Sequence, residues 1–98
     1  MDPTITCTSK LWLWSGGKAS WHFITIPKEY YPLIKEFGMS AAGFGSVRVR
    51  VTIGTTTWKT SVFPSKEGVF LLPIKSEVRK KEKLSLDDTV TVTLSLTS

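Results

Sequence analysis

The strictest pattern in the chain is an alternation of apolar and polar residues from Ser46 to Ile53. Every second position holds Val or Ile, and the positions between them hold Ser, Arg or Thr. Because successive side chains of a strand point to opposite faces, this pattern predicts a strand with one buried face and one exposed face. The rest of the chain is organised around this strand.

A two-residue hairpin loop is predicted at Gly54-Thr55, because Gly supplies the positive φ that a type I′ or II′ turn needs. The returning strand then runs from Thr56 to Phe63, and its register makes Trp58 a core residue. The predicted cross-strand pairs are Val51 with Trp58, Val47 with Val62, and Arg50 with Lys59. Like charges in the last pair leave two interpretations open, a basic stripe for a partner or a well-solvated face.

Other segments predict a mainly β domain with two short helices. Alternating runs predict strands over 4–13, 21–26, 69–72 and 89–96, and the pair Gly16-Gly17 predicts a hairpin after the first of them. A helix is predicted from Pro27 to Gly38, with an irregular first turn because of Pro32, and another over 75–83. We therefore expect one small six-stranded barrel domain over residues 1–98, because closure removes exposed edges.

Composition and charge restrict the class of protein. Thirteen Lys and Arg against eight Asp and Glu give a net charge of +5, a mild preference for anionic partners. Cys7 is the only cysteine, so we expect a reduced thiol and no disulfide. The N-terminus lacks the regions of a signal peptide, and the longest apolar run, 69–72, is too short to cross a membrane. These features predict a cytoplasmic protein with no membrane partner.

The sequence offers few groups for catalysis. His22 is the only histidine, so a Cys/His zinc site or a triad with a second His or Cys cannot be assembled, and we expect a structural role for His22. No phosphate loop or dinucleotide fingerprint is present, and the carboxylates lie in predicted turns and helix surfaces. We predict no catalytic residue, no metal site and no cofactor, and a binding module rather than an enzyme.

Basic and aromatic residues give the positive signals. The candidate basic surface consists of Arg50, Lys59, Lys80, Lys81 and Lys83. It either contacts phosphates or is a solubilising face with ordinary helix ion pairs, such as Arg79 with Glu82. Four tryptophans exceed what a core of this size needs, and Trp12 and Trp14 lie beside the Gly-Gly turn. Core or interface packing is favoured for them over a ligand contact.

Several blocks make the chain recognisable by resemblance. They are Trp14-Ser-Gly-Gly-Lys-Ala-Ser-Trp-His-Phe-Ile-Thr-Ile-Pro27, Trp58-Lys-Thr-Ser-Val-Phe-Pro64 and Leu72-Pro-Ile-Lys-Ser-Glu-Val-Arg-Lys80. These blocks resemble the bacterial domain-of-unknown-function family nineteen-oh-five. The resemblance implies a double-split β-barrel, the fold of AbrB-like and MazE-like regulators, and it implies no particular activity. One departure is Asp87-Asp88, where the family usually has Gly-Asp, so this turn must form without Gly.

The family blocks also suggest a site, because they are polar where packing alone does not demand it. The candidate ligand or partner patch consists of Arg48, Trp58, Ser61, Lys75 and Arg79. As one site, this patch would bind an anion or a partner; alternatively, Lys75 and Arg79 cap strand ends and carbonyls at the barrel rim.

The function predicted from these features is a non-catalytic binding or interaction module, a monomer or weak dimer, for a protein or a small anionic ligand. The alternative is a nucleic-acid-binding protein of AbrB-like type, which rests on analogy with fold relatives. It is less favoured, because AbrB-like binding needs a dimer with interleaved hairpins, whereas this chain has enough strands to close a barrel alone.

Overall fold

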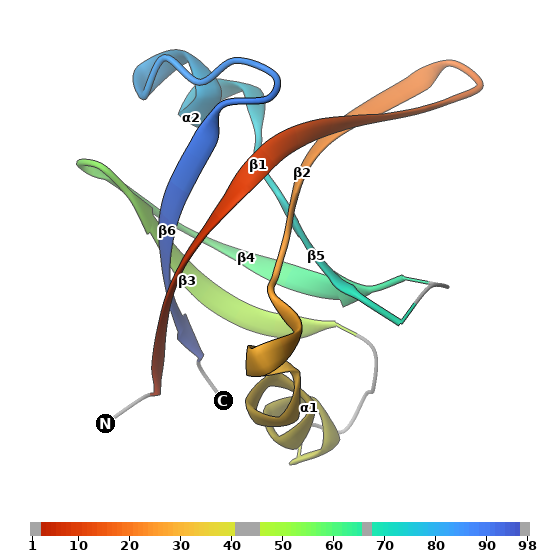
Figure 1. The fold of residues 1–98 in the computed structure, drawn as a ribbon, viewed down its shortest axis with the longest axis vertical. Coiled ribbons are helices and arrows are strands. Elements are labelled where there is room, and N and C mark those ends of the chain that lie inside the picture. Colours follow the sequence, from red (N-terminus) through yellow and green to blue (C-terminus); the bar gives the residue numbers. More distant parts are fainter. Residues whose placement is uncertain (1–2, 41–45, 66–67, 97–98) are drawn as a thin grey trace.

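A β-barrel forms the body of the protein (Figure 1). The computed structural model describes residues 3–40, 46–65 and 68–96. The strands are β1 (Thr4–Gly16), β2 (Ala19–Thr25), β3 (Val47–Ile53), β4 (Thr56–Pro64), β5 (Phe70–Pro73) and β6 (Thr89–Leu96). The helices are a 3₁₀ turn, η1 (Lys28–Tyr30), and the α-helices α1 (Tyr31–Ser40) and α2 (Ser76–Lys81). The predicted mainly β fold is confirmed, since six antiparallel strands close in the order β1-β2-β5-β4-β3-β6.

The barrel consists of two sheets, and β1 and β4 each belong to both of them. β1 pairs with β6 over residues 4–10 and with β2 over residues 11–16. β4 pairs with β3 over residues 56–62 but with β5 only through Phe63 and Pro64. β5 ends at Pro73, which has no backbone N–H to continue a ladder. The first half of β4 therefore has no paired strand on the side of β5. This leaves an opening in the barrel wall next to the chain that follows β5.

Alternation along the strands fills the interior. The three valines of β3 and Ile53 are at most 5% exposed, and the predicted register of β3 against β4 is confirmed at all three pairs. Trp58 faces inward as predicted, but it is only half-buried. It packs against the buried core, as the register predicted, and it stays partly exposed because β5 does not pair with this part of β4. Cys7 lies in the core, where burial and then the charge of Glu29 raise the pKa of its thiol.

Both hairpin loops have a positive φ at their first residue. Gly17 has φ 60° and Gly54 has φ 57°, whereas the second residue of each loop does not, the pattern of a type II′ turn. The β3–β4 loop is held by Glu82, whose Oε2 accepts hydrogen bonds from the hydroxyls of Thr55 (3.4 Å) and Thr56 (2.6 Å). Glu82 thus connects the C-terminal end of α2 to this hairpin, which is not the pairing with Arg79 considered from the sequence.

The first helical segment begins as an irregular turn and is regular only from Tyr31, as Pro32 predicted. The prediction that it ends at Gly38 is wrong, because α1 continues to Ser40. Tyr31 and Ile34 are buried, and the Tyr31 hydroxyl accepts a hydrogen bond from the Phe70 N–H at 3.2 Å. The described part of the chain contains no helix long and apolar enough to span a membrane.

The turn before β6 adopts the geometry that glycine usually supplies. Asp87 has φ 69°, so the position at which the resemblance implies a Gly is in the left-handed region. Its N–H donates to the Leu11 carbonyl at 2.8 Å, and the Leu11 N–H donates to the Asp88 carbonyl at 3.0 Å. The Asp88 carboxylate accepts from the Ser85 N–H at 2.8 Å. The turn is thus attached to β1 although it lacks glycine.

We predict that Asp87→Gly stabilises the protein by about 0.5–1 kcal/mol, because glycine removes the steric cost of a left-handed L-residue. The backbone hydrogen bond to Leu11 stays available to glycine. Asp88→Gly is the matched control, and it should lower stability because it removes the acceptor of the Ser85 N–H. Urea unfolding of both variants checks this, and a less stable Asp87→Gly variant would show that the account of this turn is wrong.

Candidate functional site

A groove lies where the barrel wall opens. We call it the basic groove; its volume is about 200 Å³, and its lining residues are Trp21, His22, Trp58, Lys59, Thr60, Pro73, Ile74 and Lys75. β2 supplies one side of this groove and β4 supplies another. A longer β5 would continue between these two strands, since its last residue pairs with Phe23 of β2. The groove therefore occupies the place that a longer β5 would fill.

The chain leaves the barrel immediately after β5. The Ile74 N–H donates to the His22 carbonyl at 2.9 Å, which is the last backbone link to β2. Ile74 and Val78 are at most 2% exposed, so the start of α2 packs against the end of the core. Lys75 lies between these two buried residues in extended conformation, and its side chain is exposed at the groove.

Arg79 determines the tautomer of His22, the only histidine in the sequence. Its Nη1 lies 3.3 Å from His22 Nε2, and its Nε donates to the Ile74 carbonyl at 3.2 Å. Because a guanidinium has only donors, His22 Nε2 is the acceptor and the ring proton resides on Nδ1. Partial burial and then the Arg79 charge lower the pKa of His22, so the ring is neutral at neutral pH.

The predicted patch is divided between two faces. Trp58 and Lys75 line the basic groove, and Arg79 contacts His22 beside it. Arg48 and Ser61 form a cross-strand pair that lies an odd number of residues from the inward-facing pair of Val51 and Trp58. Their side chains therefore point to the outer face of β3 and β4. Arg79 also caps a carbonyl at the barrel rim, which agrees with the structural alternative for this residue.

The candidate basic surface is exposed throughout. Arg50 and Lys59 lie opposite each other on the outer face of β3 and β4, as predicted from the register. Lys80, Lys81 and Lys83 are exposed on α2 and just after it. Of these five residues, Lys59 is the one that also lines the basic groove.

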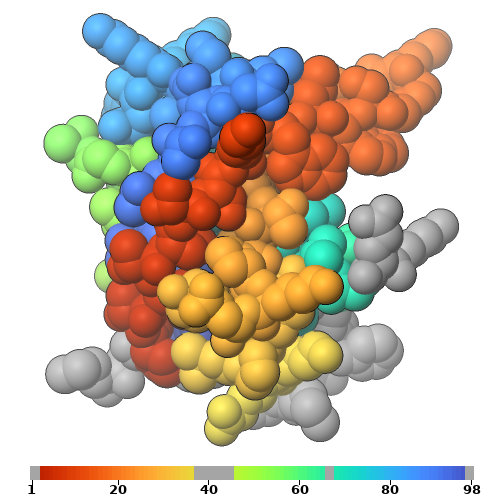
Figure 2. All heavy atoms as spheres, viewed as in Figure 1, coloured from red at the N-terminus to blue at the C-terminus, as the bar shows by residue number. Residues whose placement is uncertain are grey.

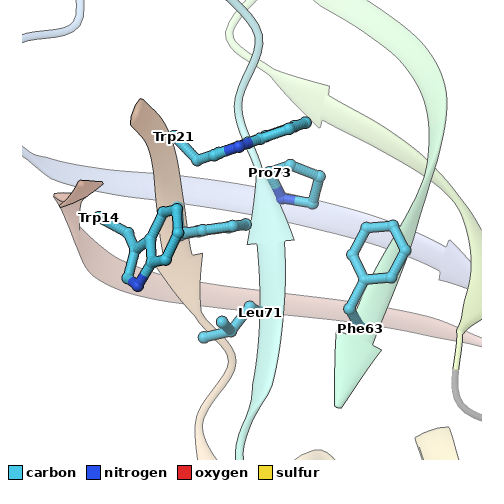
Figure 3. Close-up of a pocket in the computed structure, with 6 residues that line it drawn as sticks. Trp14, Trp21, Phe63, Leu71 and Pro73 are labelled. Atoms are coloured by element: carbon cyan, nitrogen blue, oxygen red, sulfur yellow. The ribbon is translucent and has the colours of Figure 1, made fainter. Parts of the chain in front are cut away.

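A second groove was not predicted from the sequence. We call it the aromatic groove (Figure 3); its volume is about 360 Å³, and its lining residues are Trp14, Trp21, Phe23, Phe63, Leu71 and Pro73. Trp14, Trp21 and Phe63 are 46%, 53% and 44% exposed, which is unusual for large apolar side chains. The signal was present in the hairpin register, because Trp14 pairs with Trp21 across the first loop.

The aromatic side chains are held by their neighbours. Trp21 stacks on Phe23 with ring centroids 6.3 Å apart and an interplanar angle of 12°. Trp12 packs against Phe23 at 5.4 Å, and its indole N–H donates to the Thr25 hydroxyl at 3.0 Å. Trp12 is therefore a half-buried support outside the groove lining, whereas Trp14 and Trp21 form its wall.

Gly16 allows Trp14 to lie along the hairpin. A Cβ atom at Gly16 would lie 2.5 Å from Cη2 and 2.7 Å from Cζ2 of the Trp14 ring, closer than real Cβ contacts. The ring thus covers the glycine near the tip of the β1–β2 hairpin, which projects from the rest of the barrel (Figures 1 and 2). Any larger residue at this position requires Trp14 to move.

The two grooves are neighbours. Trp21 and Pro73 line both of them. Figure 3 shows Trp14 on one side of β5 and Phe63 on the other, with Leu71 and Pro73 between them, and the Trp21 ring lies across the end of β5 beside Pro73. The outer face of the barrel therefore presents an apolar groove whose Pro73 end adjoins the basic groove.

Comparison with known protein families identifies the family of this chain. Residues 8–94 match the family described as Domain of unknown function (DUF1905), and the chain belongs to this family. The match covers both grooves and confirms the resemblance seen in the sequence. No curated protein matches the chain. The family carries no assigned activity, so the function has to be argued from the grooves themselves.

We predict that the pKa of His22 lies below 6.5, the value of an unperturbed histidine. Since the unfolded chain then binds the proton first as pH falls, the contribution of His22 to stability is present above pH 6.5 and declines below it. Replacement of Arg79 by Met should raise this pKa without restoring it fully, because partial burial is the larger cause. An NMR titration of the His22 ring measures both values, with Lys80→Met as a charge-matched control. A wild-type pKa at or above 6.5 would contradict this geometry.

Proposed function

We propose that this protein is a binding module that holds an anionic group in the basic groove. The observation that carries the proposal is that Lys59 of β4 and Lys75, from the segment after β5, line one groove together with the half-buried ring of Trp58. Two ammonium groups on different elements can approach one anion from two sides. Such contacts are charge-assisted hydrogen bonds, each worth roughly 1.5–3 kcal/mol.

The other lining residues suit the same ligand. His22 is neutral, and its Nδ1–H is a hydrogen-bond donor. Thr60 contributes a hydroxyl, and the rings of Trp21 and Trp58 lower the local polarity. An anion bound here is therefore less screened than one on the open face of β3 and β4, where Arg50 is exposed.

The test is an amide NMR titration with inorganic phosphate and with acetate at low salt. We expect localised shifts at Trp58, Thr60 and Lys75, the residues around the basic groove. Lys75→Glu should weaken binding about tenfold, the equivalent of one charged hydrogen bond. Lys80→Glu is the matched control, because it changes the charge of α2 equally at an exposed residue outside the groove lining.

Two outcomes would contradict the proposal. Equal losses in Lys75→Glu and Lys80→Glu would show that net charge alone attracts the anion. No localised shift with either anion would exclude the basic groove as an anion site. A parallel titration with short duplex DNA tests the alternative function, since DNA binding would shift Arg50, Lys80 and Lys81 and would weaken steeply with salt.

A further inference from the structure

The geometry points to an aromatic carboxylate as the ligand, with its ring in the aromatic groove and its carboxylate in the basic groove. This inference rests on the proposed function, because it uses the basic groove as the site of the charged end. It adds a second site, the aromatic groove, and a chemical class of small molecule. Trp21 and Pro73 line both grooves and so connect them.

The walls of the aromatic groove favour a flat apolar group. Trp14, Trp21 and Phe23 come from the β1–β2 hairpin, and Phe63 comes from β4. The Trp21 and Phe23 rings are stacked nearly parallel, and another ring is stabilised when it extends such a stack or packs edge-to-face against it. The volume of about 360 Å³ lies within the range of small-molecule sites.

The different charge of the two grooves determines the orientation of the ligand. The residues named for the aromatic groove are all apolar, whereas Lys59 and Lys75 lie in the neighbouring groove beyond Pro73. A ligand that lies along β5 therefore has its apolar part over Leu71 and its end near Pro73, next to the groove that Lys59 and Lys75 line. Such an end is complementary when it is a carboxylate, because a neutral polar group would lose the attraction of both lysines.

Four indole N–H signals make the test specific. Trp14 reports on the aromatic groove, Trp58 on the basic groove and Trp21 on both, while Trp12 lies outside both linings and serves as the reference. The probes are 1-naphthylacetate, its neutral analogue 1-naphthylacetamide, and inorganic phosphate. We expect naphthylacetate to shift Trp14, Trp21 and Trp58 together. It should bind at least about tenfold more tightly than the amide, and Lys75→Glu should remove this difference.

Gly16→Ala separates the aromatic groove from the basic groove. The added Cβ must displace the Trp14 ring, and Gly16 does not need a positive φ, so the variant keeps its backbone conformation. We expect at least about fivefold weaker binding of naphthylacetate and an unchanged response to phosphate. Leu13→Ala is the matched control, because Leu13 is 41% exposed on the same strand but does not line the aromatic groove. It should leave the affinity for naphthylacetate unchanged.

The outcomes distinguish this inference from the proposed function. If phosphate shifts Trp58 but naphthylacetate binds no more tightly than phosphate and leaves Trp14 unshifted, the aromatic carboxylate is excluded and the anion site remains. If naphthylacetate and its amide bind equally, the two grooves do not act on one ligand and the inference is overturned. If the ligand-free protein forms a dimer that Trp21→Ala abolishes, a second copy covers the aromatic groove and the inference is also overturned. If no probe shifts any indole signal, both proposals fail.

Discussion

The early end of β5 at Pro73 is the constraint on which the site depends. Proline cannot donate to a further ladder hydrogen bond, and Ile74 makes one last link to His22 before the chain turns into α2. β4 is consequently paired with β5 only at Phe63 and Pro64, and its residues 56–62 pair with β3 alone. The opening in the wall, the partial exposure of Trp58 and the position of Lys75 all follow from this departure of the chain.

Much of the fold follows from local patterns in the sequence. The alternation around Val51 and the glycine at position 54 predicted the β3–β4 hairpin in its correct register. The need to bury one face and the two-residue turn together allow only one pairing of the two strands. The special turn at Asp87, which has a positive φ, was indicated by the family resemblance and not by a local pattern. Local chemistry did not predict that α1 would continue through Gly38, since glycine is also tolerated inside a helix.

The candidate site was only partly predictable, because it depends on which strands are neighbours. Trp58 and Lys75 are brought together by the barrel order, and that order cannot be read from either segment alone. Arg48 and Ser61 lie on the opposite face of the β3–β4 hairpin from Trp58. The register predicted from the sequence already implied this difference. The aromatic groove combines three strand pairings, so the sequence showed an excess of tryptophan without showing where Phe63 would meet it.

The central claim is that one ligand occupies both grooves along β5. Intermolecular nuclear Overhauser effects between 1-naphthylacetate and the protein test it most directly. The account predicts contacts from the naphthalene ring to Trp14 and Phe63, and contacts from the methylene beside the carboxylate to Pro73 and Lys75. Contacts confined to the outer face around Arg48 and Arg50, or a ring placed against Lys75 with the methylene toward Trp14, would contradict it.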